Sequence, residues 1–263
     1  MNTDQIDTLA QALDDASIRA VAIPPLSKHH AVTIDEAYRI QQATVARRLA
    51  RGERVVGIKM GFTSRAKMAQ MGVHEQIFGQ LTDAMRVDNG ASISLAHFIH
   101  PRGEPELAFL LKRSLPADVT EDEAREAIQS VAAAIEIVDS RYEAFKFSLT
   151  DVIADNASAV GFVLGPWTAC PAQLLGLEMT LTIDGEPRQL GSSSEILGDP
   201  LRSLVAAARL AAQAGMPLQA GWIVLAGAAT SAEALTAGSC VDARVKGIGS
   251  VGFRVHAEAI PAA

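Results

Sequence analysis

The chain has 263 residues, of which 49% are hydrophobic and 5% aromatic, and its formal net charge is -7. This length suits one large domain or two small ones, with enough apolar residues for a substantial core. The acidic balance disfavours a nucleic-acid surface, which needs a stripe of basic residues. The two cysteines, Cys170 and Cys240, lie far apart without a CxxC motif and predict neither a disulfide framework nor a zinc site.

The N-terminal residues predict two helices. Apolar side chains recur at helical spacing in residues 4–15, with Thr3 as the cap. Residues 33–36 form a capping box that opens a second helix. No linker follows, so we expect a single domain in which residues 1–52 flank a β-rich core formed by residues 53–263. The polar, acidic start lacks a signal-peptide pattern and no apolar run approaches ~20 residues, so we expect a cytoplasmic protein without a membrane partner.

The rest of the chain alternates short strands, hairpins and short helices. Thr120 to Glu123 forms another capping box, and Asp184-Gly185 is the turn of a predicted hairpin. Because the pattern lacks a βαβ rhythm, it favours an α+β fold with a mostly antiparallel or mixed sheet. The other predicted strands are residues 55–60, 91–95, 159–164, 222–226 and two within 241–255, and the other predicted helices are residues 149–155 and 200–214.

Three acidic residues stand out for their surroundings. Glu104 and Glu106 are two residues apart at the entry to an apolar run, a spacing that points both carboxylates to one face of an extended chain. Glu136 lies inside the apolar segment Val131–Val138, where a lone charge is costly to bury. A Glu-x-Glu pair is also common on a solvated strand face. If the three carboxylates converge, they suit a hard divalent ion, Mg²⁺ or Mn²⁺.

Two other patterns imitate functional sites. His97 and His100 have the spacing of helical metal ligands, but Pro101 disfavours helical geometry at His100. Gly247–Gly252 matches the dinucleotide fingerprint GxGxxG, which requires a following helix to hold the pyrophosphate. The residues that follow it predict a strand. We therefore expect a glycine-bearing hairpin and no nucleotide cofactor.

Five strings, in family order along nearly the whole chain, resemble the hydratase/decarboxylase branch of the fumarylacetoacetate hydrolase superfamily. They are Gly57–Ser64, His100–Glu106, Ala134–Arg141, Ala154–Ser158 and Leu225–Thr230. The resemblance implies a fumarylacetoacetase C-terminal-like fold, a mixed β-sandwich or roll with flanking helices. It also implies that Glu104, Glu106 and Glu136 are Mg²⁺ ligands. Gly103 departs from the small β-branched residue or alanine expected there and predicts a looser strand beside two ligands.

The resemblance further implies metal-dependent decarboxylation of 2-oxo-3-hexenedioate to 2-hydroxypenta-2,4-dienoate, in the meta-cleavage degradation of aromatic compounds. Lys59 and Asp83 are then the expected catalytic residues, and Arg141, Lys146 and Thr230 the expected substrate-binding residues. Each of the four charged side chains also has a simpler interpretation. Lys59 suits the surface of an edge strand, Asp83 suits an ordinary turn, and Arg141 and Lys146 suit a solvated loop.

Three alternative functions remain open from the sequence. A 2-oxopent-4-enoate hydratase of the same family would use the same ion and add water to the dienol, with Asp83 and Lys59 moving protons. An acylpyruvate hydrolase is weakened because no His-Glu dyad is apparent. A non-catalytic partner of the hydratase is the third. For the decarboxylase we expect a small 2-oxo dicarboxylate substrate, a complex with the pathway hydratase, and self-association into a homo-oligomer.

Overall fold

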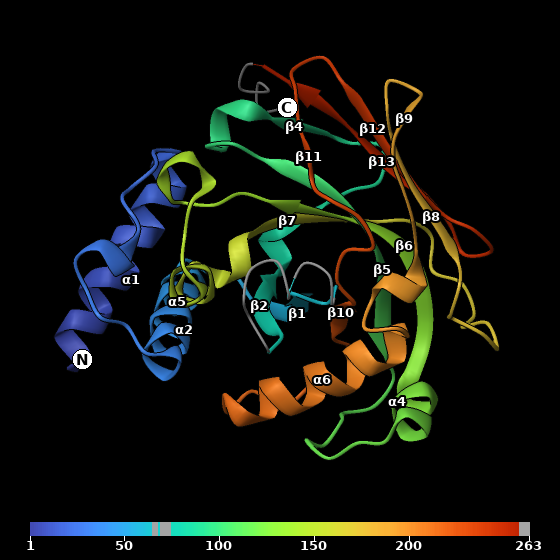
Figure 1. Ribbon diagram of the computed structural model, residues 1–263, viewed down its shortest axis with the longest axis horizontal. Helices are drawn as coiled ribbons and strands as arrows, with labels where there is room; N and C mark the ends of the chain where they lie inside the picture. The colour runs from blue at the N-terminus through green and yellow to red at the C-terminus, as the bar shows by residue number, and fades with distance from the viewer. Residues whose placement is uncertain (65–67, 69–74, 258–263) are drawn as a thin grey trace.

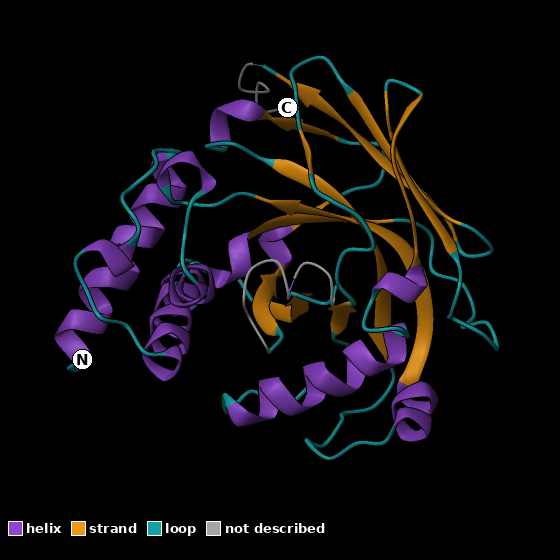
Figure 2. Ribbon diagram, in the orientation of Figure 1, coloured by secondary structure: helices purple, strands orange, loops and turns teal. Residues whose placement is uncertain are grey.

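The computed structural model describes residues 1–64, 68 and 75–257, and its strands form two curled sheets flanked by helices (Figures 1 and 2). The smaller sheet has the order β4 (Ser92–Ser94), β13 (Gly249–His256), β12 (Cys240–Val245), β8 (Glu178–Ile183), β9 (Glu186–Ser192). The larger sheet has the order β2 (Ile77–Thr82), β1 (Val55–Gly61), β10 (Ile223–Leu225), β5 (Arg102–Leu111), β6 (Ile128–Val138), β7 (Ala159–Leu164), β3 (Arg86–Val87), and β11 (Glu233–Ala234) pairs with β5. Both sheets mix parallel and antiparallel pairs, which confirms the predicted α+β fold.

The two sheets pack face to face, and strand alternation decides which side chains enter the core between them. In β5 and β6 the odd-numbered residues, such as Leu107 and Ile135, pack with Val241 and Phe253 of the smaller sheet. The even-numbered residues therefore point to the opposite face of the larger sheet. That face carries Glu104, Glu106 and Glu136.

The N-terminal helices lie at the side of the sandwich, together with α5 (Leu149–Ala154), and share a second apolar core with it (Figure 1). Helix α1 spans Thr3–Arg19, longer than predicted, and its cap is Asn2 instead of Thr3. The Asn2 side chain accepts a hydrogen bond from the Gln5 backbone N–H at 2.9 Å, and the Gln5 side chain accepts one from the Asn2 backbone N–H, so these two residues form the capping box. Helix α2 spans Ile34–Ala50 and begins at the predicted capping box.

The other predicted elements occur at or close to their expected residues. The predicted hairpin turns at Asp184-Gly185. The glycine-bearing segment Gly247–Gly252 contains the turn after β12 and the first residues of β13, and these two strands are antiparallel, as predicted. Helix α4 (Glu121–Ala127) leads directly into β6. Helix α6 (Pro200–Gln213) lies beside β1 and β2 of the larger sheet (Figure 1). None of the described helices is both long and apolar enough to cross a membrane.

One parallel pair of strands joins distant parts of the chain. Gly57 of β1 lies opposite Ile223 of β10. A Cβ atom at Gly57 would lie 1.9 Å from the Ile223 carbonyl oxygen, so only glycine permits this approach. The pairing places β1, with Lys59, two strands away from the glutamates of β5.

Candidate metal centre and substrate cavity

Glu104, Glu106 and Glu136 converge on one point of the larger sheet. Glu104 and Glu136 are direct cross-strand partners, and Glu106 follows Glu104 on the same face. One carboxylate oxygen from each of the three residues lies within 4.8 Å of the other two. Glu106 and Glu136 are fully buried, and Glu104 is partly exposed. The geometry is that of a three-carboxylate cation site with one open side.

Lys59 completes this cluster from β1. Its side chain is buried and its Nζ lies 2.9 Å from Glu136 Oε1, an ion pair by distance although not aligned as a hydrogen bond. Burial lowers the pKa of Lys59, but the nearby carboxylates, Glu136 first, outweigh burial and raise the pKa above its usual value. Lys59 is therefore a charged ammonium. The simpler interpretation, an exposed lysine on an edge strand, is wrong because β1 lies between β2 and β10.

The charges of the cluster do not balance, and this imbalance fits a divalent cation. Burial and the neighbouring Glu136 raise the pKa of Glu106 well above its usual value, in spite of Lys59. Glu106 Oε1 and Glu136 Oε2 are buried, and no described residue donates a hydrogen bond to them. Buried carboxylate oxygens without donors are costly. Hard oxygen ligands of this kind suit Mg²⁺, which would supply the missing positive charge.

Two irregular backbone segments support the cluster. The 3-10 turn Asn156–Ser158 has three consecutive residues with positive φ, a left-handed conformation that non-glycine residues rarely adopt. It presents the Ala157 carbonyl oxygen to Lys59 Nζ at 3.0 Å. Gly227, with φ 103°, donates its backbone N–H to Glu106 Oε2 at 2.8 Å. Non-glycine residues held in the left-handed conformation, as in this 3-10 turn, are concentrated at functional sites.

A cavity of about 220 Å³ opens beside Glu104 and Lys59. Its polar wall includes Thr63, Ser64 and Arg102, and its apolar wall includes Phe145 and Phe147. Phe62, Phe145, Ala157 and Ser158 all line it and all have positive φ. The cavity combines anionic and cationic groups with an apolar surface, and it is large enough for a small organic acid.

Arg102 is a site residue that the sequence analysis did not identify. Its guanidinium lies over the Phe145 ring, 4.9 Å from the centroid. A signal was available, because Arg102 precedes Glu104 by two residues and shares its face of the strand. Gly103, between them, does not loosen the strand as predicted. It pairs with Ile137 on one side and Glu233 on the other, and Leu235 packs against it.

Arg141 does not line this cavity, which corrects its predicted role in substrate binding. The side chain is buried, and its guanidinium donates to the Asp155 carboxylate, to the Asp155 carbonyl and, at 2.7 Å, to the Asp139 carbonyl. Its backbone N–H also donates to Asp155 Oδ2, at 3.0 Å. Burial raises the pKa of Asp155 to about 6 against the opposing effect of Arg141. A guanidinium held by so many internal acceptors is structural.

Asp83, predicted as catalytic, also lies outside the residues that line the cavity. It follows β2 and forms an ion pair with Arg54 at 3.0 Å, so the ordinary turn aspartate is the better description. Lys146 is exposed and does not line the cavity. Thr230 is buried beside the cavity segment that includes Ala228 and Ala232, and its hydroxyl donates to the Ser231 carbonyl at 3.2 Å. The structure thus brings together the three glutamates and Lys59, but not Asp83, Arg141 or Lys146.

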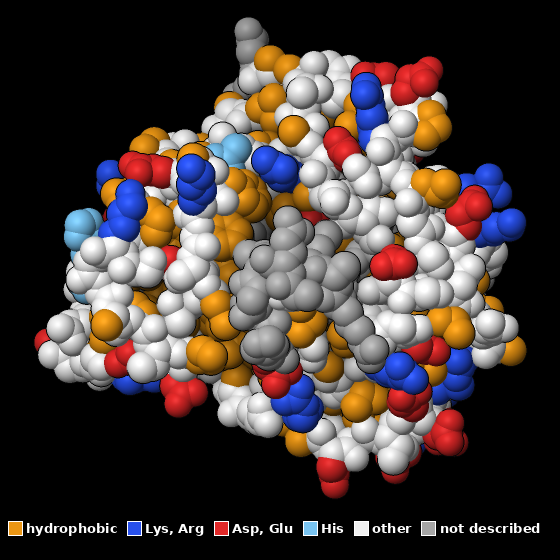
Figure 3. Space-filling view, in the orientation of Figure 1, with side chains coloured by type: hydrophobic (Ala, Val, Ile, Leu, Met, Phe, Trp, Pro, Cys, Tyr) orange, Lys and Arg blue, Asp and Glu red, His pale blue; other side chains and the backbone are white. Residues whose placement is uncertain are grey.

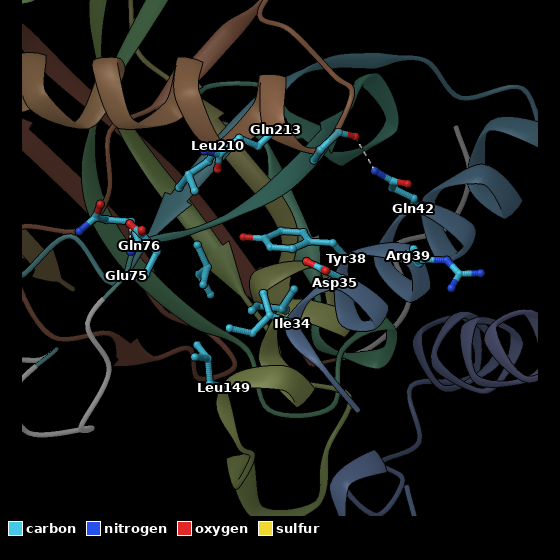
Figure 4. A pocket seen from close by; sticks show the side chains of 13 residues that line it. Ile34, Asp35, Tyr38, Arg39, Gln42, Glu75, Gln76, Leu149, Leu210 and Gln213 are labelled. Carbon is cyan, nitrogen blue, oxygen red and sulfur yellow. Dashed lines mark hydrogen bonds between the residues drawn. The ribbon is translucent and has the colours of Figure 1, made fainter. Parts of the chain in front are cut away.

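A larger cavity, about 410 Å³, lies between α2, α6 and the start of β2 (Figure 4). Tyr38 points into it, and Gln42 at its edge donates to the Ala214 carbonyl at 2.8 Å. Its described lining includes Asp35 and Glu75 but no converging group of metal ligands. Because the metal-ligand group lies beside the smaller cavity, the smaller cavity is the better candidate for chemistry.

On the face shown in Figure 3, basic and acidic side chains are interspersed.

The two histidines that imitate metal ligands have other contacts. The backbone N–H groups of Ile99 and His100 donate to the Asp139 carboxylate at 2.7 and 2.9 Å. The His100 ring lies 5.0 Å from the Phe145 ring, and His97 closes a short 3-10 turn. Neither histidine belongs to the three-carboxylate group, the one candidate metal cluster among the described residues.

Comparison with known proteins identifies the family of the chain. Residues 54–256 match the family model described as fumarylacetoacetate (FAA) hydrolase C-terminal. The chain is 52% identical to a 4-oxalocrotonate decarboxylase from Pseudomonas sp, over 97% of this chain and 99% of the relative. It is 36% identical to a 2-hydroxyhexa-2,4-dienoate hydratase from Comamonas testosteroni, over 93% and 95% of the two chains. The solved 4-oxalocrotonate decarboxylase from Pseudomonas putida G7, complexed with magnesium and adipate, superposes with a TM-score of 0.93 at 34% identity, covering 97% of this chain and 98% of that one.

Proposed function

The chain belongs to the fumarylacetoacetate hydrolase family, and from this premise we infer that it is a Mg²⁺-dependent decarboxylase of 2-oxo-3-hexenedioate, also called 4-oxalocrotonate. The products are 2-hydroxypenta-2,4-dienoate and CO2, in the meta-cleavage degradation of aromatic compounds. The observation that carries this conclusion is the convergence of three carboxylates, one of which, Glu104, lines a small cavity together with Lys59.

We propose that Glu104, Glu106 and Glu136 hold the ion. The support is their convergence and the two buried oxygens that lack donors among the described residues. When bound, Mg²⁺ supplies Lewis-acid stabilisation of the negative charge that develops on the 2-oxo group as CO2 leaves. Glu106 is fixed by the Gly227 N–H and Glu136 by Lys59, so the ligand oxygens are held in place before an ion arrives.

Lys59 acts in this proposal as a fixed positive charge near the developing enolate. Its raised pKa keeps it protonated at neutral pH, and a Schiff base requires the neutral amine. Phe145 and Phe147 line the same cavity, and their apolar rings lower the local dielectric constant, which strengthens the electrostatic effect of Lys59. Borohydride reduction in the presence of substrate should leave Lys59 unmodified. A stable adduct at Lys59, detected by mass spectrometry, would replace the electrostatic role with a covalent one.

The hydratase alternative loses its predicted acid, because Asp83 forms an ion pair with Arg54 outside the cavity lining. The decisive experiment incubates the purified protein and Mg²⁺ separately with 2-oxo-3-hexenedioate and with 2-hydroxypenta-2,4-dienoate. We expect Mg²⁺-dependent CO2 release from the first compound and no water addition to the second. Water addition alone would identify a hydratase, and no turnover of either compound would identify a non-catalytic partner.

We further propose a complex with the hydratase that consumes the product, and self-association of the chain. Such a complex would pass the dienol product directly to the next enzyme. Ile18 on α1 and Ile34 and Leu49 on α2 are exposed apolar side chains that an interface between copies would cover. Two free cysteines support a reducing, cytoplasmic location. Light scattering of the chain alone and mixed with the hydratase measures both assemblies.

A further inference from the structure

Arg102 adds a positive charge to the cavity wall that the chemistry above does not use. Arg102 is the first residue of β5 and lies on the same face as Glu104 and Glu106. Its cross-strand partner in β6 is Val138, which also lines the cavity. Two residues of an antiparallel strand span ~7 Å. That distance is comparable to the length of an extended six-carbon chain. A substrate bound at the acidic cluster can therefore reach Arg102 with its other end.

Within the described part of the chain, no residue accepts a hydrogen bond from Arg102. The Arg102 side chain is half-buried, and its guanidinium lies over the Phe145 ring. A guanidinium has five N–H donors in a planar fork that matches a carboxylate. Phe145 supports the flat face of this fork and has itself a left-handed backbone, with φ 56°. The arrangement holds the guanidinium in one plane while its edge stays free to donate.

We propose that Arg102 binds the substrate carboxylate remote from the ion and so selects 2-oxo dicarboxylates over 2-oxo monocarboxylates. This inference rests on the proposed function, because the ion fixes which end of the substrate lies at the acidic cluster. A second carboxylate facing Phe145 and Phe147 without a cation would be costly to desolvate. The dienol that a hydratase consumes has no second carboxylate, so Arg102 suits the decarboxylase.

The carboxylate at Arg102 is the one that leaves. The C5–C6 bond breaks, its electron pair forms the C4=C5 double bond, the C3=C4 pair moves to C2=C3, and the C2=O pair moves onto oxygen, which takes a proton from solvent. Negative charge therefore moves away from Arg102 during the reaction. Arg102 stabilises the bound substrate more than the transition state, so its removal should raise KM without lowering kcat.

The test compares two unreactive acids of equal chain length by calorimetry. 2-Oxoadipate has both carboxylates but lacks the C3=C4 double bond, and 2-oxohexanoate lacks the distal carboxylate. We expect the Mg²⁺-loaded protein to prefer 2-oxoadipate by roughly 10- to 100-fold, the range for a charge-assisted hydrogen bond. Arg102→Gln should abolish the preference, and Arg102→Lys should leave part of it. Arg188→Gln, on exposed strand β9, is the matched control and should keep the full preference.

The outcomes separate the two levels of the proposal. Mg²⁺-dependent binding of 2-oxohexanoate reports on the acidic cluster alone and should be equal in the parent protein and Arg102→Gln. Its absence in the parent protein would refute the proposed metal centre. An undiminished preference for 2-oxoadipate in Arg102→Gln, or no preference in the parent protein, would refute the role of Arg102. Arg102→Lys gives the same answer if the glutamine variant does not fold.

Discussion

Two buried clusters each combine positive and negative side chains, Arg141 with Asp155 and Lys59 with three glutamates. The clusters differ in how many of their charges and hydrogen-bonding atoms have partners. Arg141 and Asp155 form one cation-anion pair, and the guanidinium donates to three acceptor groups around it. Lys59 faces three glutamates, and buried oxygens of Glu106 and Glu136 lack donors among the described residues. Burial alone does not distinguish a functional charge from a structural one. The difference lies in the balance of charge and in the oxygens left without partners.

The largest expected effect comes from removing one charge of the unbalanced group. Glu106→Gln should reduce CO2 release by about 10³-fold or more, because the ion loses a ligand and with it several kcal/mol of transition-state stabilisation. The metal-free variant should be at least as stable as the parent, since a buried, uncompensated negative charge is gone. CO2 release and urea unfolding measure the two effects. Glu186→Gln, exposed at the start of β9, is the control and should change neither. Retained activity in Glu106→Gln would remove the metal from the mechanism.

The balanced pair should respond in the opposite way. Arg141→Met leaves the Asp155 carboxylate buried without its cation and should lower the free energy of unfolding by about 3–5 kcal/mol. Mg²⁺ binding by the folded variant should persist, because Arg141 does not line the cavity. Urea unfolding measures the first effect and calorimetry the second. The double variant Arg141→Met/Asp155→Leu should recover much of the loss. A loss below about 1 kcal/mol in the single variant would contradict a structural role.

A smaller effect should appear in the pH dependence of stability without metal. The folded-state pKa of Glu106 is raised above 4.5, so its stabilising contribution is present at low pH and is lost as pH rises through the raised pKa. The slope should reach about 1.4 kcal/mol per pH unit. Asp155, with its pKa raised to about 6, adds a slope of the same sign at lower pH.

Urea unfolding in EDTA at pH values above 6 reduces the contribution of Asp155, because Asp155 is then mostly ionised, and a slope that remains there is assigned to Glu106. Saturating Mg²⁺ or the Glu106→Gln variant should flatten the curve, and Arg141→Met should not. A flat curve for the parent protein in EDTA would show that the glutamate cluster is balanced without an ion.

Much of the fold follows from local sequence signals. The capping boxes at Thr33 and Thr120 begin helices where predicted, and Asp184-Gly185 turns a hairpin. The start of α1 differs because asparagine is as good a cap as threonine, and Asn2 forms a capping box with Gln5. The order of strands in the two sheets has no local signal and depends on contacts between distant segments.

The candidate site was predictable where a residue conflicts with its neighbours. Glu136 inside an apolar strand and Lys59 as the one charge of its strand are such residues, and both belong to the cluster. Asp83 and Arg141 resemble site residues equally well in sequence, but each meets an opposite charge from elsewhere in the chain. Which charges meet depends on the tertiary fold. Arg102 was missed because its role depends on Phe145, which a loop far along the chain brings over it.

The parallel pairing of β1 with β10 has a consequence for the order in which the molecule is completed. It joins Gly57 to Ile223, so most of the chain must be present before these strands meet. Gly227, the amide that holds Glu106, arrives with β10. During synthesis, Glu104, Glu106 and Glu136 are therefore present long before Gly227, whose backbone N–H holds Glu106. The complete arrangement of the three glutamates therefore exists only after β10 has joined the sheet.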